Sequence, residues 1–221
     1  MCACRVSRMY VPHGKGVGFA FGMGAAEQAA FDPVMKMAYV ASEQGYVNLV
    51  DYSDASNPKL GASIDLSDHT ITDVDVCGGL LAVGIVGVVK TDPGMVKLYS
   101  TAAATSPPVL LSDHTVGPLP DMVAFSKDCS KLAVANEGEG VYGDAGLVDP
   151  EGSVSIISIE LGTVQTVSFA PVATSDEDLK ARRVYYLHHI VHYIVHHTVH
   201  YRVHYMSGVY LCLGQGRASA A

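Results

Sequence analysis

The sequence predicts an all-β protein, and three observations favour a β-propeller within that class. A unit of short strands recurs along the chain at spacings of 43 and 51 residues. Repeats of about 40 to 50 residues with several strands per unit are typical of propeller blades. No amphipathic helical pattern separates these strands, which argues against a parallel α/β sheet. The 22 glycines and 10 prolines lie mostly at expected turns.

Three units of this kind follow one another. Each contains an extended segment, a polar turn, a strand of small residues, a loop that opens on glycine, and a strand of alternating pattern. The units cover residues 31–54, 74–102 and 122–160. We place Val40, Val83 and Val134 at equivalent positions of the inner strands, and these three residues set the spacing.

Three units cannot close a ring, because propellers typically have four to eight blades. A fourth unit is expected to begin at TVQTVSF, from residue 163. The sequence therefore predicts an irregular N-terminal segment (residues 1–24), an incomplete propeller of about three to four blades (25–183) and a low-complexity tail of His, Tyr and Val (184–221). The tail repeats every four residues, which is most simply a translated short tandem DNA repeat, and nonspecific metal binding is its alternative role. Its histidines in register are His188, His192, His196, His200 and His204.

The composition excludes some classes of partner. With 14 Lys and Arg against 22 Asp and Glu, the formal net charge is −8 and no basic stripe is present. We therefore expect no nucleic-acid partner. The apolar runs are short and broken by glycine, so no transmembrane segment is expected. No signal peptide is visible, which fits either an intracellular protein or a secreted one whose true start is missing.

The cysteines are odd in number and scattered, at Cys2, Cys4, Cys77, Cys129 and Cys212. We expect them to be unpaired, as small hydrophobic and turn residues. The redox compartment stays open on this basis.

Several motifs resemble those of one known family. The stretches are LPDM (Leu119–Met122), ANEGEG (Ala135–Gly140), DPEGS (Asp149–Ser153) and VNLVDYSDASNP (Val47–Pro58). Together they make residues 25–183 similar to the choice-of-anchor I family of β-propeller proteins. The resemblance implies a YVTN-like, seven-bladed propeller that is secreted or attached to the cell surface, with no established catalytic activity. The chain departs from the family pattern at Gly140, where proline is common, and at Cys129, where a turn glycine is usual.

The loop at residues 135–153 concentrates carboxylates between two predicted strands. Ca²⁺ takes six to eight oxygen ligands, and a glycine-rich backbone can supply carbonyls between the carboxylates. Turn formation, in which Asp149 and Glu151 accept backbone amide hydrogens, is the interpretation that the sequence favours, with a calcium site and a rim site for another ligand as its alternatives. The candidate ligands are Glu137, Glu139, Asp144, Asp149 and Glu151, with Asn136 beside them.

Other candidate groups suggest structural roles. Asp32, Asp73, Asp75 and Asp121 are interpreted as turn-makers at the blade entries, because nothing in the sequence establishes a desolvated catalytic pair. The two SDHT tetrapeptides (Ser67–Thr70 and Ser112–Thr115) cannot form a Ser-His-Asp triad, since triads assemble from distant segments. We interpret them as a repeated linker between blades.

These observations predict a non-catalytic module for binding or adhesion, outside the cell or at its surface, in a fragment of a longer propeller. Its partner would be an unidentified extracellular protein or glycan. The alternative is a metal-dependent hydrolase, similar to a phosphoesterase, that uses a site on the propeller rim.

Overall fold

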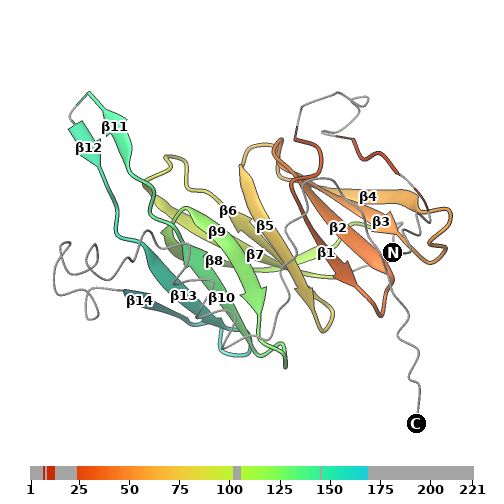
Figure 1. The fold of residues 1–221 in the computed structure, drawn as a ribbon. Coiled ribbons are helices and arrows are strands. Elements are labelled where there is room, and N and C mark those ends of the chain that lie inside the picture. The colour runs from red at the N-terminus through yellow and green to blue at the C-terminus, as the bar shows by residue number, and fades with distance from the viewer. Residues whose placement is uncertain (1–6, 8, 13–23, 102–105, 145, 169–221) are drawn as a thin grey trace, which may run out of the picture.

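The computed structural model describes residues 7, 9–12, 24–101, 106–144 and 146–168 (Figure 1). Within these residues every regular element is a β-strand, which confirms the all-β prediction. Three four-stranded antiparallel sheets follow one another along the chain, and a two-stranded hairpin is inserted into the third. We call the sheets blades 1, 2 and 3.

Each blade is a simple meander of strands. Blade 1 consists of β1 (Gln28–Asp32), β2 (Met37–Ser42), β3 (Tyr46–Asp51) and β4 (Lys59–Asp65). Blade 2 consists of β5 (Ile71–Cys77), β6 (Leu80–Ile85), β7 (Pro93–Ser100) and β8 (Val109–Pro118). Blade 3 consists of β9 (Pro120–Phe125), β10 (Lys131–Asn136), β13 (Ser153–Ser158) and β14 (Val164–Ser168). The inserted hairpin comprises β11 (Val141–Gly143) and β12 (Gly146–Val148).

The first strands of the blades lie next to one another, since β5 contacts both β1 and β9. The apolar core fills the spaces between neighbouring blades. Tyr39 of blade 1 packs with Leu81 and Val83 of blade 2, and Leu98 of blade 2 packs with Phe125 and other residues of blade 3. Each fully buried aliphatic or aromatic side chain contributes about 1.5–3 kcal/mol of transfer free energy. Sheets packed face to face around adjoining first strands form a β-propeller, which is incomplete in the described residues.

The three valines that set the repeat occupy equivalent places, but not in the innermost strands. Val40, Val83 and Val134 lie in β2, β6 and β10, the second strand of each blade. The innermost strands are β1, β5 and β9, which the sequence analysis treated only as extended segments. Polar residues such as Asp73 and Asp75 interrupt the apolar pattern of β5, which explains why the apolar second strand was taken for the inner one.

The prediction that a fourth blade begins at residue 163 is wrong. Val164–Ser168 is β14, which pairs antiparallel with β13 and forms the outer edge of blade 3. Periodicity alone does not assign a short strand to the end of one blade or the start of the next. Residues 169–183, the predicted tail and most of the predicted irregular N-terminal segment lie outside the described residues.

The two SDHT tetrapeptides adopt different structures. Ser67–Thr70 links β4 to β5, as the sequence analysis predicted, but Ser112–Thr115 lies inside β8. There His114 is buried and its Nε2 lies 2.9 Å from Ser112 Oγ. The same four letters thus serve as a linker in one place and as a strand in another, because their tertiary surroundings differ.

Candidate functional site

Three of the family-like motifs meet at one point between blades 2 and 3. Leu119 of LPDM, with φ of 50°, turns the chain from β8 into β9 and its carbonyl accepts the backbone N–H of Glu137 at 2.8 Å. The N–H of Gly138 donates to the carbonyl of Pro118 at 3.2 Å. A Cβ on Gly138 would lie 2.6 Å from the carbonyl oxygen of Pro150, so the returning DPEGS strand requires glycine there. The motifs therefore build a structural junction.

Asn136, the last residue of β10, fixes the base of the acidic loop. Its side chain is fully buried, and its Nδ2 donates to Ser153 Oγ at 3.0 Å and to Ser155 Oγ at 2.9 Å. Its Oδ1 has no hydrogen-bond partner among the described residues. A Cβ on Gly117 would lie 2.7 Å from Asn136 Cγ, so β8 of blade 2 approaches this amide closely.

The five candidate calcium ligands follow both arms of the loop instead of converging. Glu139 forms an ion pair with Lys90 of the β6–β7 loop, while Asp144 lies in the turn between β11 and β12. Glu137, Asp149 and Glu151 are exposed near the base of the hairpin. Nowhere in the described part of the chain do three His, Cys, Asp or Glu side chains come close enough to hold a metal ion. The calcium site stays a prediction that would require this loop to rearrange.

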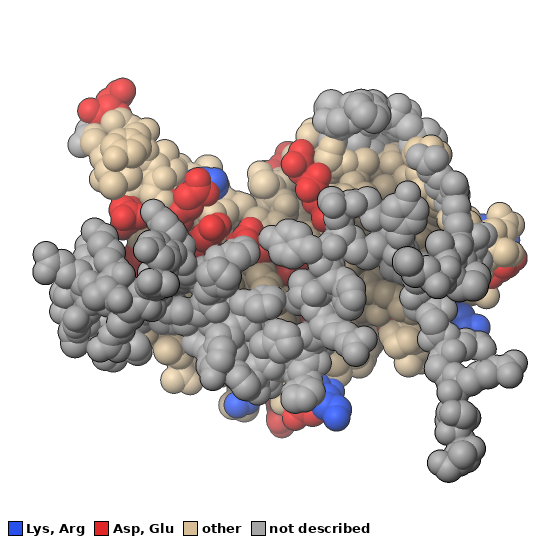
Figure 2. Space-filling model, in the orientation of Figure 1, with Lys and Arg blue, Asp and Glu red and all other residues tan. Residues whose placement is uncertain are grey.

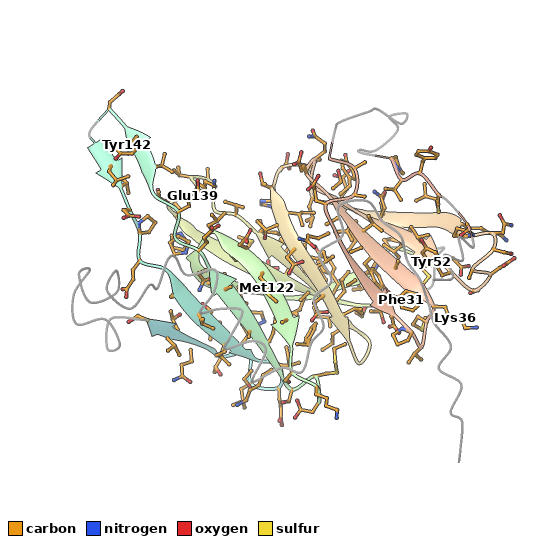
Figure 3. All side chains as sticks on the ribbon, in the orientation of Figure 1. Phe31, Lys36, Tyr52, Met122, Glu139 and Tyr142 are labelled. Carbon is orange, nitrogen blue, oxygen red and sulfur yellow. A yellow bond between two sulfur atoms is a disulfide. The ribbon has the colours of Figure 1, made fainter. Side chains whose placement is uncertain are left out.

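The hairpin itself was not predicted from the sequence. It projects from the body of the molecule, with Tyr142 near its end and Glu139 at its base (Figure 3). The register pairs Val141 with Val148 and Tyr142 with Leu147, and all four side chains are exposed. The signal that could have found it is the pair of short apolar stretches, VY and GLV, on either side of Asp144.

Asp73 and Asp75 are not turn-makers, which corrects the interpretation from sequence. Both lie inside β5 and bridge to the next blade: Asp73 Oδ2 accepts the N–H of Val123 at 2.9 Å, and Asp75 Oδ2 accepts that of Phe125 at 2.8 Å. Burial raises the pKa of Asp73 to about 7 and that of Asp75 to about 6. For Asp73, the neighbouring carboxylates of Asp75 and Asp121 raise the pKa further.

The other two aspartates, Asp32 and Asp121, differ in their structural roles. Asp32 is a turn-maker as predicted, because its Oδ1 accepts the N–H groups of Val34 at 2.8 Å and Met35 at 3.0 Å in the β1–β2 turn. Asp121 lies exposed within β9 and therefore does not cap the entry to the blade.

A disulfide bond joins blade 2 to blade 3, which overturns the expectation of unpaired cysteines. Cys77 ends β5, and Cys129 lies in the β9–β10 turn, with the two Cα atoms 5.6 Å apart. Cys129 has a φ of 59°, a conformation that favours glycine, and this accounts for the turn glycine expected there from the family pattern. The pairing could not be read from the sequence, because the two cysteines are separated by 52 positions that include most of blade 2.

The described residues contain no helix long and apolar enough to cross a membrane. The interface between blades 2 and 3 thus combines an apolar core, two half-buried carboxylates and a disulfide. Together with the projecting β11–β12 hairpin, these features define a partial β-propeller with an insertion in its third blade.

The chain belongs to the choice-of-anchor I family, whose domain description matches residues 27–200. The matched range ends inside the predicted low-complexity tail (residues 184–221). Over 147 residues the chain is 33% identical to the mesenchyme-specific cell surface glycoprotein of Strongylocentrotus purpuratus. That alignment covers 64% of this chain but 18% of the glycoprotein, so the chain spans less than a fifth of its relative.

Solved structures resemble the fold only in part. A protein from Lactobacillus plantarum aligns with a TM-score of 0.47 and 11% identity, over 66% of this chain and 41% of its own. Saccharomyces cerevisiae Sqt1 aligns with a TM-score of 0.45 and 10% identity, over 67% of this chain and 36% of Sqt1. The WD40 domain of Toxoplasma gondii coronin aligns with a TM-score of 0.37 and 14% identity, over 63% of this chain and 43% of the coronin chain.

Proposed function

We propose that this chain is part of a non-catalytic binding or adhesion module that acts outside the cell or at its surface. Membership of the choice-of-anchor I family and the name of the sea urchin relative support a surface location. The observation that carries the proposal is the disulfide between Cys77 and Cys129. Structural disulfides persist in oxidising compartments and are rare in the cytosol.

The ligand would be an extracellular protein or glycan. Propellers present their loops at the ends of the blades, where they can bind a partner without any change in the packed sheets. In this chain a long loop of this kind, between β10 and β13, carries exposed apolar side chains and carboxylates, and its described residues include no buried reactive group. This composition favours recognition over catalysis.

The location can be tested by expressing the full chain behind a secretion signal and staining intact, unpermeabilised cells and the medium. We expect the protein to be secreted with Cys77 and Cys129 oxidised. Retention in the cytosol of its native tissue, with both thiols reduced, would contradict the proposal.

Binding and catalysis can be separated with the secreted protein. We expect it to bind at least one member of a panel of immobilised extracellular-matrix proteins and glycans, and to leave phosphate-ester and carboxyl-ester substrates intact. Calcium-dependent hydrolysis that is lost on Glu137→Gln would instead support the alternative of a metal-dependent hydrolase.

A further inference from the structure

We propose that the β11–β12 hairpin and the adjoining β6–β7 loop form a docking surface for an extended apolar segment of a partner protein that is flanked by basic residues. This inference rests on the proposed function and specifies the surface that would perform it. We call the surface the hairpin patch and define it by Val88, Val89, Val141, Tyr142, Leu147 and Val148.

The fold does not explain the apolar residues of the hairpin. Strands β11 and β12 pair only with each other in the described structure and contribute no buried residue. A two-stranded hairpin on its own is marginally stable in water. Yet Val141 and Val148 share one face of this hairpin, while Tyr142, at 83% exposure, shares the other with Leu147. Exposed apolar groups gathered in this way are typical of interaction sites.

The neighbouring loop extends the same surface. Val88 is fully exposed and Val89 is exposed at 53%, both in the segment between β6 and β7. Lys90, the next residue, forms the ion pair with Glu139 at the base of the hairpin. This contact brings the β6–β7 loop next to the base of the hairpin, so the exposed apolar side chains of the two loops lie at the same end of the molecule. Tyr142 is suited to act as the anchor, because tyrosine combines a large apolar ring with a polar end.

Charge decides which kind of partner fits. Asp92, Asp144, Asp149 and Glu151 lie in the same two loops as the apolar side chains, and acidic atoms mark the end of the projecting hairpin (Figure 2). Among the described lysines, Lys90 alone lies in the loops at this end, and Glu139 already engages it. A second copy of the chain would bring the same carboxylates face to face, and an anionic membrane would repel them. An extended apolar segment flanked by Lys and Arg matches both the charge and the apolar hairpin.

The test uses the secreted full chain and three octapeptides in which Val alternates with Lys, Ser or Glu. These peptides probe an extended apolar ligand with a basic, neutral or acidic rim. We expect binding in the order Lys, Ser, Glu by fluorescence anisotropy, and a weakening of the Val–Lys complex at higher salt. Equal binding of the three peptides, or no binding of the Val–Lys peptide, would overturn the proposal.

Two variants and a matched control locate the binding surface. Tyr142→Ser with Leu147→Ser should weaken the Val–Lys complex at least tenfold, and replacing residues 141–148 by a short Gly-Ser turn should abolish it. Val34→Ser is the control. Val34 is about as exposed as Tyr142, but it lies in the β1–β2 turn at the end of the blades opposite to the hairpin. Circular dichroism and thermal melts should show that the three blades stay folded in each variant, since β11 and β12 contribute no buried residue.

The same variants separate this inference from the proposed function. If the parent protein binds a member of the matrix and glycan panel and the hairpin variants bind it equally well, the hairpin patch is rejected while the binding function stands. If the parent binds the Val–Lys peptide but nothing on the panel, the patch is supported and the choice of extracellular ligand is wrong.

Discussion

Asp73 on β5 holds the backbone N–H of Val123 on β9, with its Oδ2 2.9 Å from the amide nitrogen. Strands β5 and β9, which are more than forty residues apart in sequence, are thus joined by a hydrogen bond from backbone to side chain. Neighbouring strands of one β-sheet are instead joined by hydrogen bonds between their backbones. Asp75 repeats the arrangement one step along β5, toward Phe125. The pair fixes the register of blade 3 against blade 2 near the centre of the propeller.

This bridge makes stability depend on pH in an unusual direction. The pKa of Asp73 is raised from its ordinary value of 3.8 to about 7 and that of Asp75 to about 6. The folded protein therefore holds protons that the unfolded chain releases near pH 4. Because the folded state binds more protons, the contribution of these residues to stability is largest below pH 4 and is lost as the pH rises toward 7.

We predict that Asp73→Asn flattens the fall in melting temperature between pH 4 and pH 7, because asparagine keeps an oxygen acceptor for Val123 without the charge. Asp73→Ala should destabilise the protein by about 1–3 kcal/mol near pH 4, since the buried amide loses its partner, and by less as the pH rises toward 7. Thermal melts of both variants across this range check the prediction. An unchanged slope in Asp73→Asn would contradict it.

Asp128 titrates in the opposite sense. Hydrogen bonds from the Ser126 and Ser130 hydroxyls lower its pKa to about 2. Its folded-state pKa lies below its unfolded value, so its contribution is present above pH 4 and is lost as the pH falls toward 2. Asp128→Asn should therefore lower the melting temperature above pH 4, have little effect near pH 2 and so flatten the fall in stability between them, as thermal melts between pH 2 and pH 7 would show.

The disulfide should matter for stability in proportion to the loop that it closes. For a separation of 52 residues, the loop-entropy account gives about 4 kcal/mol. We predict that the double change Cys77→Ser and Cys129→Gly lowers the midpoint of urea unfolding. Cys77→Ser with Cys129→Ala should be about 1 kcal/mol less stable again, because position 129 requires a left-handed backbone. Equal midpoints for the parent and both variants would refute this account.

Much of the fold was accessible from the sequence because propeller blades repeat. The equivalent valines Val40, Val83 and Val134 identified three blades in the right order. The innermost strand was misassigned because Asp73 and Asp75 look like turn residues until the neighbouring strand β9 is in place. The bond between Cys77 and Cys129 depends on the packing of two blades, which no local pattern encodes.

The base of the acidic loop offers a further test. Asn136 is buried and bonds both Ser153 and Ser155. Asn136→Ala should destabilise the protein by about 1–3 kcal/mol by leaving these hydroxyls without their donor. Gln165→Ala is the matched control, because Gln165 is exposed on β14 of the same blade. Equal denaturant midpoints for the two variants would show that the amide does not organise the loop.

The calcium site predicted from the loop can be examined in the same melts. Bound calcium would stabilise the folded state by about 2.7 kcal/mol at a hundredfold excess over its dissociation constant. The gain should disappear when Glu137 and Glu139 are both changed to Gln. A melting temperature that is indifferent to calcium and to a chelator would remove the metal and leave the carboxylates as part of the loop surface.

Blades 2 and 3 are neighbouring propeller blades, and the bond between Cys77 and Cys129 links them covalently. Peptide mapping by mass spectrometry, on secreted protein digested without reduction, tests it most directly. We predict a single linked species that joins the peptide containing Cys77 to the peptide containing Cys129. Recovery of both cysteines as free, alkylated thiols, or of either one linked to another cysteine, would contradict the account.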